Sequence, residues 1–405
     1  MSLLRATTAA VRRLGPGNRV LFLTTLLLQT GSVALPFLTA YLVEQGRYAP
    51  GTVGLVVACY GVGGLLADLC SGPLLRLMSA RTLMTAGLAG NAVAVTTLPY
   101  LRTALALAVL VTVWGFCYEV FMPASYLETV RLSPALDLKI AFSFNRLAIN
   151  LGMGVGPVAG AVLFARRPAV LFVINALSAA AAGLYLATRP PSRLPRQRDR
   201  GVSAPEPGSP AAGTDPPAHG LRFRTLLLLS APIHYAYGLP LTFLSVYILR
   251  YLHLPSLWVG LVFAVSAGSV VLFEIPLNTA MRGVGTVPAL IAGYMLAAAG
   301  FALMGVVRTG PALLLATLLW TGAEMMVFPG LMHCVSQLSS PATKSRNMSL
   351  YAAVMNAGLM VAPQLALILA ARTGPASPWY LASFTIGAAL TGLLALTRRR
   401  TSHGR

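Results

Sequence analysis

Long apolar runs alternate with short polar segments along the whole chain. Twelve of these runs hold about 20 residues each, the length that crosses the hydrocarbon layer of a bilayer as an α-helix. They cover residues 20–43, 53–75, 82–101, 103–127, 140–164, 168–188, 225–249, 257–280, 286–306, 310–333, 347–371 and 377–396. Because lipid offers the backbone no hydrogen bonds, such runs must satisfy their own polar groups as helices. The pattern predicts an all-α membrane protein with twelve transmembrane helices.

The chain repeats itself at a constant separation of 206 positions. Trp114 recurs as Trp320, and Asp68 recurs as the acidic Glu274. The other matches are Tyr41 with Tyr247, Val53–Val56 with Val259–Val262, Arg76 with Arg282, Pro123 with Pro329, Asn150 with Asn356, Gly152 with Gly358 and Pro157 with Pro363. Two halves therefore carry the same helices in the same order, as two parallel, pseudo-symmetric six-helix bundles. Such repeats are typical of secondary transporters, whose substrate binds between the halves.

The longest polar stretch, residues 189–224, lies midway along the chain and is rich in Pro, Ser, Gly and Arg. A segment of this composition cannot bury enough apolar surface to form a fold of its own. We therefore expect an N-terminal half at 1–188, a cytoplasmic linker at 189–224, a C-terminal half at 225–397 and a cytoplasmic tail at 398–405. The other loops are short, and the chain has no G-x-x-x-x-G-K-[ST] sequence for ATP.

The net charge of +20 could indicate a nucleic-acid ligand, but the positions of the charges indicate a membrane orientation instead. Of the 30 Lys and Arg residues, 23 fall on the side that holds both termini and the linker, and 7 fall on the other side. Lys and Arg are enriched in cytoplasmic loops, so both termini are expected in the cytoplasm. Arg outnumbers Lys by 28 to 2, which favours a GC-rich bacterial gene and hence the bacterial inner (plasma) membrane.

Metal or cofactor chemistry is not indicated. The four cysteines do not have metal-ligand spacing, and the five histidines are scattered. We expect no cofactor, no bound metal and no enzymatic activity.

Four of the ten acidic residues lie inside apolar runs: Asp68, Glu119, Glu274 and Glu324. A carboxylate near the bilayer centre costs about 2.5–3.5 kcal/mol, so four such residues suggest a function. Asp68 and Glu274 are equivalent by the repeat, and Glu119 and Glu324 lie at nearly equivalent positions. Burial favours the neutral form of a carboxylic acid, so a proton and a cationic substrate can compete for it.

The run at 140–164 contains Gly152-Met-Gly-Val-Gly-Pro-Val-Ala-Gly-Ala161. This stretch resembles the antiporter signature G-x-x-x-G-P-x-x-G-G of exporters in the major facilitator superfamily, with the final Gly replaced by Ala161. The twelve helices and the central basic loop resemble the same superfamily, and most closely its bacterial drug-efflux members. Small residues four positions apart, here Gly152, Gly156 and Gly160, give a flat helix face for close packing, and Pro157 permits bending.

A second signature of the superfamily, G-x-x-x-D-R-x-G-R-[RK], is degraded in this chain. The aligned stretch runs from Gly72 to Arg81, and Arg76 stands at the acidic position. The usual latch between the halves is therefore not expected from this stretch, and Asp68 is the candidate for a displaced acid.

The resemblance implies that the first, fourth, seventh and tenth helices line a central cavity, and that the second, fifth, eighth and eleventh pack between the halves. By that implication Glu119, Glu324 and His234 are candidates for proton coupling or substrate contact. The gating and interface candidates are Asp68, Glu274, Arg76, Arg146, Gly152, Gly156, Pro157 and Gly160. The cavity-lining candidates are Trp114, Tyr118, Asn150, Trp320, Met325 and Asn356. For all of these, the alternative is that they pack or hydrogen-bond within the bundle.

The sequence thus favours an exporter of small amphipathic or cationic compounds, working by proton antiport with alternating access, and the resemblance implies a monomer. An importer or facilitator of a nutrient or metabolite is the second interpretation, although Asn, Gln and Asp are scarce in the cavity helices. A membrane enzyme or sensor is the third, and it lacks both clustered catalytic residues and a partner domain.

Overall fold

The computed structural model describes residues 15–44, 47–133, 138–189, 223–340 and 343–401, and these are helical with no strand among them. The helices of the N-terminal half are α2 (Pro16–Gly31), α3 (Leu35–Glu44), α4 (Pro50–Leu77), α5 (Ala80–Thr97), a 3₁₀ turn (Leu98–Tyr100), α6 (Ala104–Glu119), α7 (Phe121–Leu132), α8 (Leu138–Arg166) and α9 (Val170–Thr188). Those of the C-terminal half are α10 (Phe223–Thr242), α11 (Leu244–Val246), a π-helical turn (Tyr247–Tyr251), α12 (Leu257–Ala280), a 3₁₀ turn (Met281–Gly283), α13 (Thr286–Val306), α14 (Gly310–Gln337), α15 (Lys344–Thr373) and α16 (Ser377–Thr401).

The described helices form twelve rods, one for each predicted span, when α2 is taken with α3, α6 with α7, and α10 with α11. Ten of these rods are long and apolar enough to cross a membrane, and the pair α10–α11, bent by 54°, makes an eleventh. The remaining rod, α5, is a helix of the expected length, but Arg81, Asn91 and several Thr residues make it more polar. The all-α architecture is therefore confirmed, with ten qualifying spans among the described residues, or eleven with the bent pair, and α5 as the least apolar of the twelve rods.

Proline explains how several helices begin and bend. Pro16 and Pro50 stand in the first turn of α2 and α4, where the missing N–H costs nothing. Pro232 and Pro240 lie inside α10, and the chain bends just after the second of them. Proline in a helix interior removes a backbone hydrogen bond and its ring crowds the preceding turn, which accounts for the bend.

The ends of the predicted segments differ slightly from the structure. Most of the predicted linker at 189–224, namely residues 190–222, lies outside the described part of the chain. The end of the predicted tail, residues 402–405, lies outside it as well. α16 continues to Thr401, past the predicted end of the half at 397. Arg is a good helix former, so a run of Arg residues can extend a helix beyond the apolar span.

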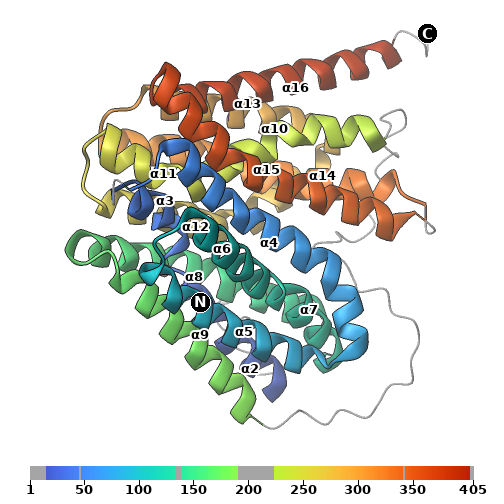
Figure 1. Cartoon of the computed structure of the whole chain (residues 1–405). Helices are drawn as coiled ribbons and strands as arrows, with labels where there is room; N and C mark the ends of the chain where they lie inside the picture. Colours follow the sequence, from blue (N-terminus) through green and yellow to red (C-terminus); the bar gives the residue numbers. More distant parts are fainter. Residues whose placement is uncertain (1–14, 45–46, 134–137, 190–222, 341–342, 402–405) are drawn as a thin grey trace, which may run out of the picture.

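Two helix pairs join the halves, and the repeat relates them to each other. α4 packs against α15, and α12 packs against α8. A shift of 206 residues carries α4 onto α12 and α8 onto α15. A third contact, of α3 with α10 and α11, lies at the end of the molecule where α4 and α12 begin. In Figure 1 the helices of the two halves converge at this end and diverge toward the opposite end, where α9 ends and α10 begins. We call the latter the linker end.

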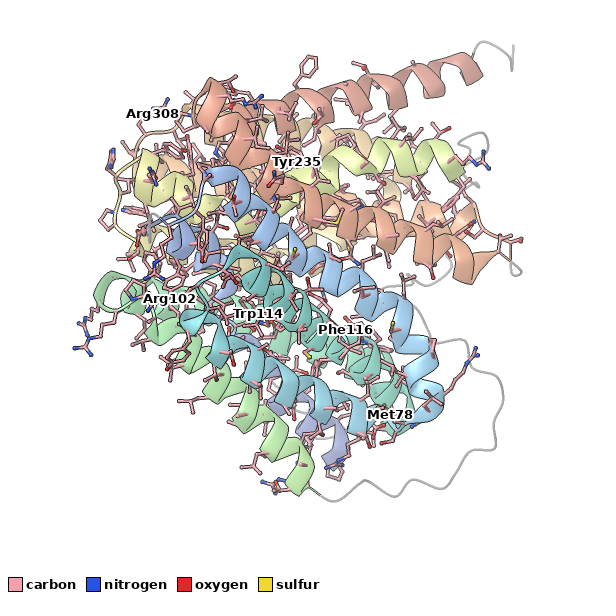
Figure 2. All side chains as sticks on the ribbon, in the orientation of Figure 1. Met78, Arg102, Trp114, Phe116, Tyr235 and Arg308 are labelled. Atoms are coloured by element: carbon pink, nitrogen blue, oxygen red, sulfur yellow. The ribbon has the colours of Figure 1, made fainter. Side chains whose placement is uncertain are left out.

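Side chains confirm the parallel arrangement of the halves. Arg102 and Arg308, which are 206 residues apart, lie at the same end of the molecule in Figure 2, and Met78 lies at the linker end.

Glycine allows the close approach of the halves away from the linker end. A methyl group on Gly54 of α4 would lie 2.8 Å from Cα of Gln364 on α15. At the equivalent position, a methyl group on Gly260 of α12 would lie 2.7 Å from Cα of Val158 on α8. Neither site has room for a side chain, so both interfaces are closed at this end of the bundle.

Candidate functional site

A cavity of about 210 Å³ lies between the halves, mainly on the N-terminal side. The N-terminal half contributes Gln29, Ser32, Leu35, Pro36, Tyr60, Trp114, Tyr118, Glu119, Met153 and Pro157, and the C-terminal half contributes Leu241 and Phe263. These residues come from α2, α3, α4, α6, α8, α10 and α12, with Ser32 between α2 and α3. The cavity therefore collects helices that are distant in sequence, as a site between two repeats should.

Close packing of α4 against α6 places the polar wall of the cavity. A methyl group on Gly115 would lie 2.3 Å from the carbonyl oxygen of Tyr60, and one on Gly63 would lie 2.1 Å from that of Thr112. Only glycine fits at these two positions. The approach brings the Trp114 ring edge-on to Tyr60, with ring centroids 5.4 Å apart.

Hydrogen bonds hold the polar groups of this wall. The Tyr118 hydroxyl donates to Oε1 of Gln29 at 2.7 Å. The Tyr60 hydroxyl donates to Oε1 of Glu119 at a long 3.5 Å. Glu119 is the last residue of α6, and α7 begins at Phe121. The carboxylate thus sits at a break in its rod, beside two tyrosines and a tryptophan.

The cavity wall has one strongly charged group. Among its twelve lining residues Glu119 is the only carboxylate, and none is Lys, Arg or His. Trp and Tyr faces attract cations, and a carboxylate attracts them more strongly. The lining is therefore suited to a small cation with an apolar or aromatic body, and unsuited to an anion.

Glu119 borders one of the contacts between the halves. A methyl group on Gly64 of α4 would lie 3.2 Å from Cγ of Glu119 and 3.8 Å from Oδ1 of Asn356 on α15. Nδ2 of Asn356 donates to Oδ2 of Asp68 at 2.5 Å. Asp68 is also within electrostatic range of Glu119. One turn of α4 therefore brings together two carboxylates of one half and an amide of the other.

The equivalent interface carries a second polar contact between the halves. Arg146 of α8 forms an ion pair with Glu274 of α12. Glu324 of α14 is within electrostatic range of both. Asn150 donates its side-chain N–H to the carbonyl oxygen of Arg146 at 3.1 Å. Each half thus supplies one acid to an inter-half contact (Asp68, Glu274) and holds another nearby (Glu119, Glu324).

The predicted cavity residues divide into two groups. Trp114 and Tyr118 lie on the cavity wall, whereas Asn150, Trp320, Met325 and Asn356 are not among the residues that line it. Trp320 packs in an aromatic cluster of the C-terminal half, and its carbonyl oxygen accepts a hydrogen bond from Tyr237.

The acids of the two halves also differ in position. A shift of 206 residues places Glu119 opposite Met325, and Tyr118 opposite Glu324. The two carboxylates are therefore offset by one position, which turns a side chain by about 100° around a helix. Glu324 is not among the residues that line the cavity.

His234 lies in the core of the C-terminal half, away from the cavity lining. It is 3% exposed, and its ring lies against Phe328 and Tyr351. Neither ring nitrogen has a hydrogen-bond partner among the described residues. Its packing supports the structural alternative rather than a role in substrate contact.

The glycines of the α8 signature face their own half. Methyl groups on Gly152 and Gly156 would meet the backbone of Thr30 at 2.7–2.8 Å, and one on Gly160 would lie 3.1 Å from the ring of Phe37. Pro157 instead lines the cavity and faces Gly260 of the other half. Gly152, Gly156 and Gly160 therefore pack α8 against α2 and α3, whereas Pro157 and Val158 of the same stretch contact Gly260 of the other half.

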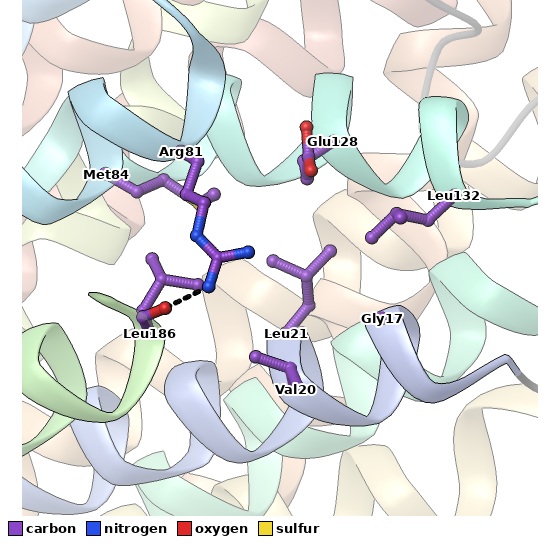
Figure 3. Close-up of a pocket in the computed structure, with 8 residues that line it drawn as sticks. All are labelled: Gly17, Val20, Leu21, Arg81, Met84, Glu128, Leu132 and Leu186. Carbon is purple, nitrogen blue, oxygen red and sulfur yellow. Dashed lines mark hydrogen bonds between the residues drawn. The ribbon is translucent and has the colours of Figure 1, made fainter. Parts of the chain in front are cut away.

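The degraded signature leaves Arg76 and Arg81 with different surroundings. Arg76 is exposed and forms no ion pair within the described residues. Arg81 donates hydrogen bonds to the carbonyl oxygens of Leu186 and Arg189 at the end of α9. It borders a small pocket with Glu128, shown in Figure 3. At about 20 Å³ this pocket has room for about one water molecule and is too small for a substrate.

Gln29, Ser32, Tyr60 and Phe263 are wall residues that the sequence did not single out. Gln29 carried a usable signal, since an amide in an apolar span needs a partner. Tyr60 and Phe263 had none, because an aromatic residue in a membrane helix most often only packs.

Comparison with known proteins gives a consistent result. The family model of the Major Facilitator Superfamily matches residues 20–351. The Bacillus subtilis protein described as the uncharacterized MFS-type transporter YhjO is 25% identical over 147 residues, which cover 36% of this chain and 37% of that protein. The chain therefore matches little more than a third of this relative's length.

Solved structures share the fold. The nucleoside transporter NupG (D323A mutant) has a TM-score of 0.76 at 14% identity, over 94% of this chain and 100% of that one. A POT family transporter in complex with 5-aminolevulinic acid has a TM-score of 0.75 at 14% identity, over 95% and 96%. The human organic anion transporter MFSD10 (TETRAN) has a TM-score of 0.61 at 19% identity, over 94% and 100%. At these identities the likeness concerns the fold alone.

Proposed function

The chain belongs to the major facilitator superfamily and is a multi-pass membrane transporter, and from this premise we propose that it exports small amphipathic or cationic compounds in exchange for protons. The observation that carries the proposal is the cavity wall, in which Glu119 is the single carboxylate among Tyr60, Trp114 and Tyr118. A proton and an organic cation are both ligands of such a carboxylate, and each excludes the other. That competition is sufficient for antiport when the site faces the two sides of the membrane in turn.

Coupling of proton movement to transport requires that binding of a proton or a cation at Glu119 affect the contact between the halves. Glu119 and Asn356 both lie next to Gly64, and Asn356 donates a hydrogen bond to Asp68 across the interface. A negative charge on Glu119 repels that of Asp68, and a bound proton or cation removes the repulsion. The proposed role of Asp68, Glu274, Arg146 and Asn356 is therefore gating, and that of Glu119 is binding. Glu324, near Glu274 and Arg146, is proposed as an accessory proton site.

The proposed setting is the bacterial inner membrane, with both termini and the linker end in the cytoplasm. This orientation rests on the 23 to 7 distribution of Lys and Arg. We propose that it works as a monomer, as the resemblance to the superfamily implies.

Uptake of a polar metabolite is the second candidate. Gln29 and Ser32 give the cavity hydrogen-bonding groups besides the aromatic rings. One of the similar structures is named as a nucleoside transporter, and another is a POT family transporter in complex with 5-aminolevulinic acid. The direction of coupled proton movement separates the two candidates.

Transport in inverted membrane vesicles tests the proposal. The vesicles are acidified inside, and a pH-sensitive dye reports proton leakage as lipophilic cations, antibiotics and metabolites are added one by one. We expect a cation to release protons from wild-type vesicles and from Arg76→Gln vesicles, and not from Glu119→Gln vesicles. If only neutral polar metabolites act, or if Glu119→Gln vesicles respond fully, the export proposal is wrong.

A further inference from the structure

We propose that the membrane-facing side of the α8–α12 contact is a phospholipid site, in which an acyl chain lies in a groove between the halves and an anionic headgroup binds Arg146. The inference depends on the membrane location of the chain and not on what it transports. It adds a ligand that acts from the bilayer, separate from the cavity that holds Glu119.

A groove of about 580 Å³ runs along this contact. Its lining is Asn150, Leu151, Gly154, Val155, Val158, Ala159 and Val162 of α8 with Ala264, Ala267, Gly268, Val271 and Leu272 of α12. Asn150 is the single polar side chain of this set. Val155 is 56% exposed and Leu272 is 66% exposed, so the groove opens outward rather than into the bundle. Exposed apolar side chains on two membrane-spanning helices face hydrocarbon, and an acyl chain matches this lining.

The groove belongs to only one of the two related interfaces, and the sequence shows why. Gly154 and Gly268 correspond by the repeat to Met360 and Val62 at the α4–α15 contact. Ala159 corresponds to Leu365. A methyl group on Gly268 would meet nothing within 4 Å, whereas one on Gly61, beside Met360, would lie 2.9 Å from the Met360 backbone. Loss of three larger side chains thus leaves the α8–α12 contact hollow on its outer side.

The groove ends at the Arg146–Glu274 ion pair. Asn150 lines the groove and bonds the carbonyl oxygen of Arg146 one turn earlier, and Glu274 follows Leu272 by two residues. The Arg146 side chain is 58% exposed and that of Glu274 is 13% exposed. A guanidinium has five N–H donors, so one carboxylate leaves donors on the exposed side for a phosphate.

The depth of Arg146 matches a headgroup position. α8 has 29 residues, and at 1.5 Å per residue it is about 44 Å long, more than the ~30 Å hydrocarbon layer. Arg146 is the third residue of the candidate span Phe144–Arg166 and so lies near the end of that span on the linker side. A phosphate at this level also meets the positive charge expected on the cytoplasmic side.

Lipid binding here has a consequence for the transporter. Met153 and Phe263 line the cavity, and their neighbours Gly154 and Ala264 line the groove, so one helix pair separates the two. A lipid phosphate on the free donors of Arg146 shares the positive charge with Glu274 and weakens a contact between the halves. Anionic lipid would thereby shift the equilibrium between the alternating states.

Photocrosslinking in nanodiscs tests the site on the full chain. The probes are phosphatidylglycerol and phosphatidylcholine with a diazirine in one acyl chain, and labelled peptides are mapped by mass spectrometry. Gly154→Met/Gly268→Val fills the groove with the residues of the other interface. Gly387→Val on α16, where a methyl group also meets nothing within 4 Å, is the matched control. Gly268→Val alone serves if the double variant does not fold.

We expect wild type and Gly387→Val to be labelled at residues 151–162 and 264–272 more than at the equivalent residues of α4 and α15. The groove-filling variant should lose this excess. Arg146→Gln should lower the ratio of phosphatidylglycerol to phosphatidylcholine labelling about fivefold, the effect of one interfacial cation, and Glu274→Gln should raise it. Equal labelling of the two interfaces, undiminished labelling of the groove-filling variant, or a ratio insensitive to Arg146→Gln would each overturn the proposal.

Discussion

Asn356 of α15 donates a hydrogen bond of 2.5 Å to Asp68 of α4 and so links the two halves of the chain. Asp68 has Glu274 as its repeat equivalent, and Asn356 has Asn150. Glu274 also contacts the opposite half, but its partner is Arg146, one turn before Asn150. The two interfaces thus use equivalent acids with different partners, an amide in one and a guanidinium in the other.

The Asp68–Asn356 bond is expected to stabilise the arrangement in which the linker ends of the halves lie as observed. Because the bond is solvent-exposed, its loss in Asn356→Ala should cost only about 1 kcal/mol, a shift of about fivefold in the equilibrium between states. Spin labels at Leu77 and Ser340, in a background without the four native cysteines, report the separation of the linker ends. An unchanged distance distribution in Asn356→Ala would contradict a gating role.

The Arg146–Glu274 ion pair should position α8 against α12 while contributing little to the free energy of unfolding. Arg146 is 58% exposed, and exposed pairs typically contribute about 0.2–1 kcal/mol. A double-mutant cycle of Arg146→Gln and Glu274→Gln, measured by thermal unfolding in detergent, should give a coupling energy within that range. Strict additivity of the two substitutions would mean that the pair does not form in solution.

Close packing of α4 on α6 should tolerate no added methyl group. Gly115→Ala places a carbon 2.3 Å from the carbonyl oxygen of Tyr60, and overpacking of this kind typically costs about 1–3 kcal/mol. We expect a lower melting temperature and a displaced Tyr60. Gly387→Ala, with open space around it, is the control and should melt like wild type. Equal melting temperatures for the two variants would show that the α4–α6 approach is looser than described.

Glu119 and Glu324 should differ in substrate binding although both are acids within membrane spans. Glu119→Gln removes the carboxylate of the cavity wall and should weaken binding of an organic cation about 10- to 100-fold, the value of a charge-assisted contact. Glu324→Gln should change affinity less than threefold in this comparison, since Glu324 does not line the cavity. Tryptophan fluorescence, with Trp114 in the cavity wall, reports binding. Equal losses in the two variants would require a cavity shared by both acids.

Much of the architecture could be predicted from the sequence, because membrane spans must be long and apolar and because the halves repeat. Each predicted span has a helical rod in the structure, and the repeat pairs Asp68 with Glu274 and α4 with α12. The residues of the cavity wall were harder to predict from the sequence. Repeat symmetry suggested that Trp114 and Trp320 would play equal parts, but only Trp114 lines the cavity.

Small local differences explain the residues that were misplaced. A one-residue offset between Glu119 and Glu324 directs the two side chains differently, and no apolar pattern reveals it. The glycines of the α8 signature were expected at the interface between halves, but Gly152 and Gly156 meet Thr30 of their own half. A flat helix face specifies close packing without specifying the partner, so the partner emerges only in the folded structure.

Proton release on substrate binding is the sharpest test of proton–cation competition at Glu119, because it separates that competition from transport. Purified protein in weakly buffered detergent solution, with a pH indicator, is mixed with a cation that is active in the vesicle assay. We expect a proton to be released as the cation binds to wild type and to Arg76→Gln, and no release from Glu119→Gln even at saturating cation. Cation binding without proton release in wild type, or undiminished release from Glu119→Gln, would contradict it.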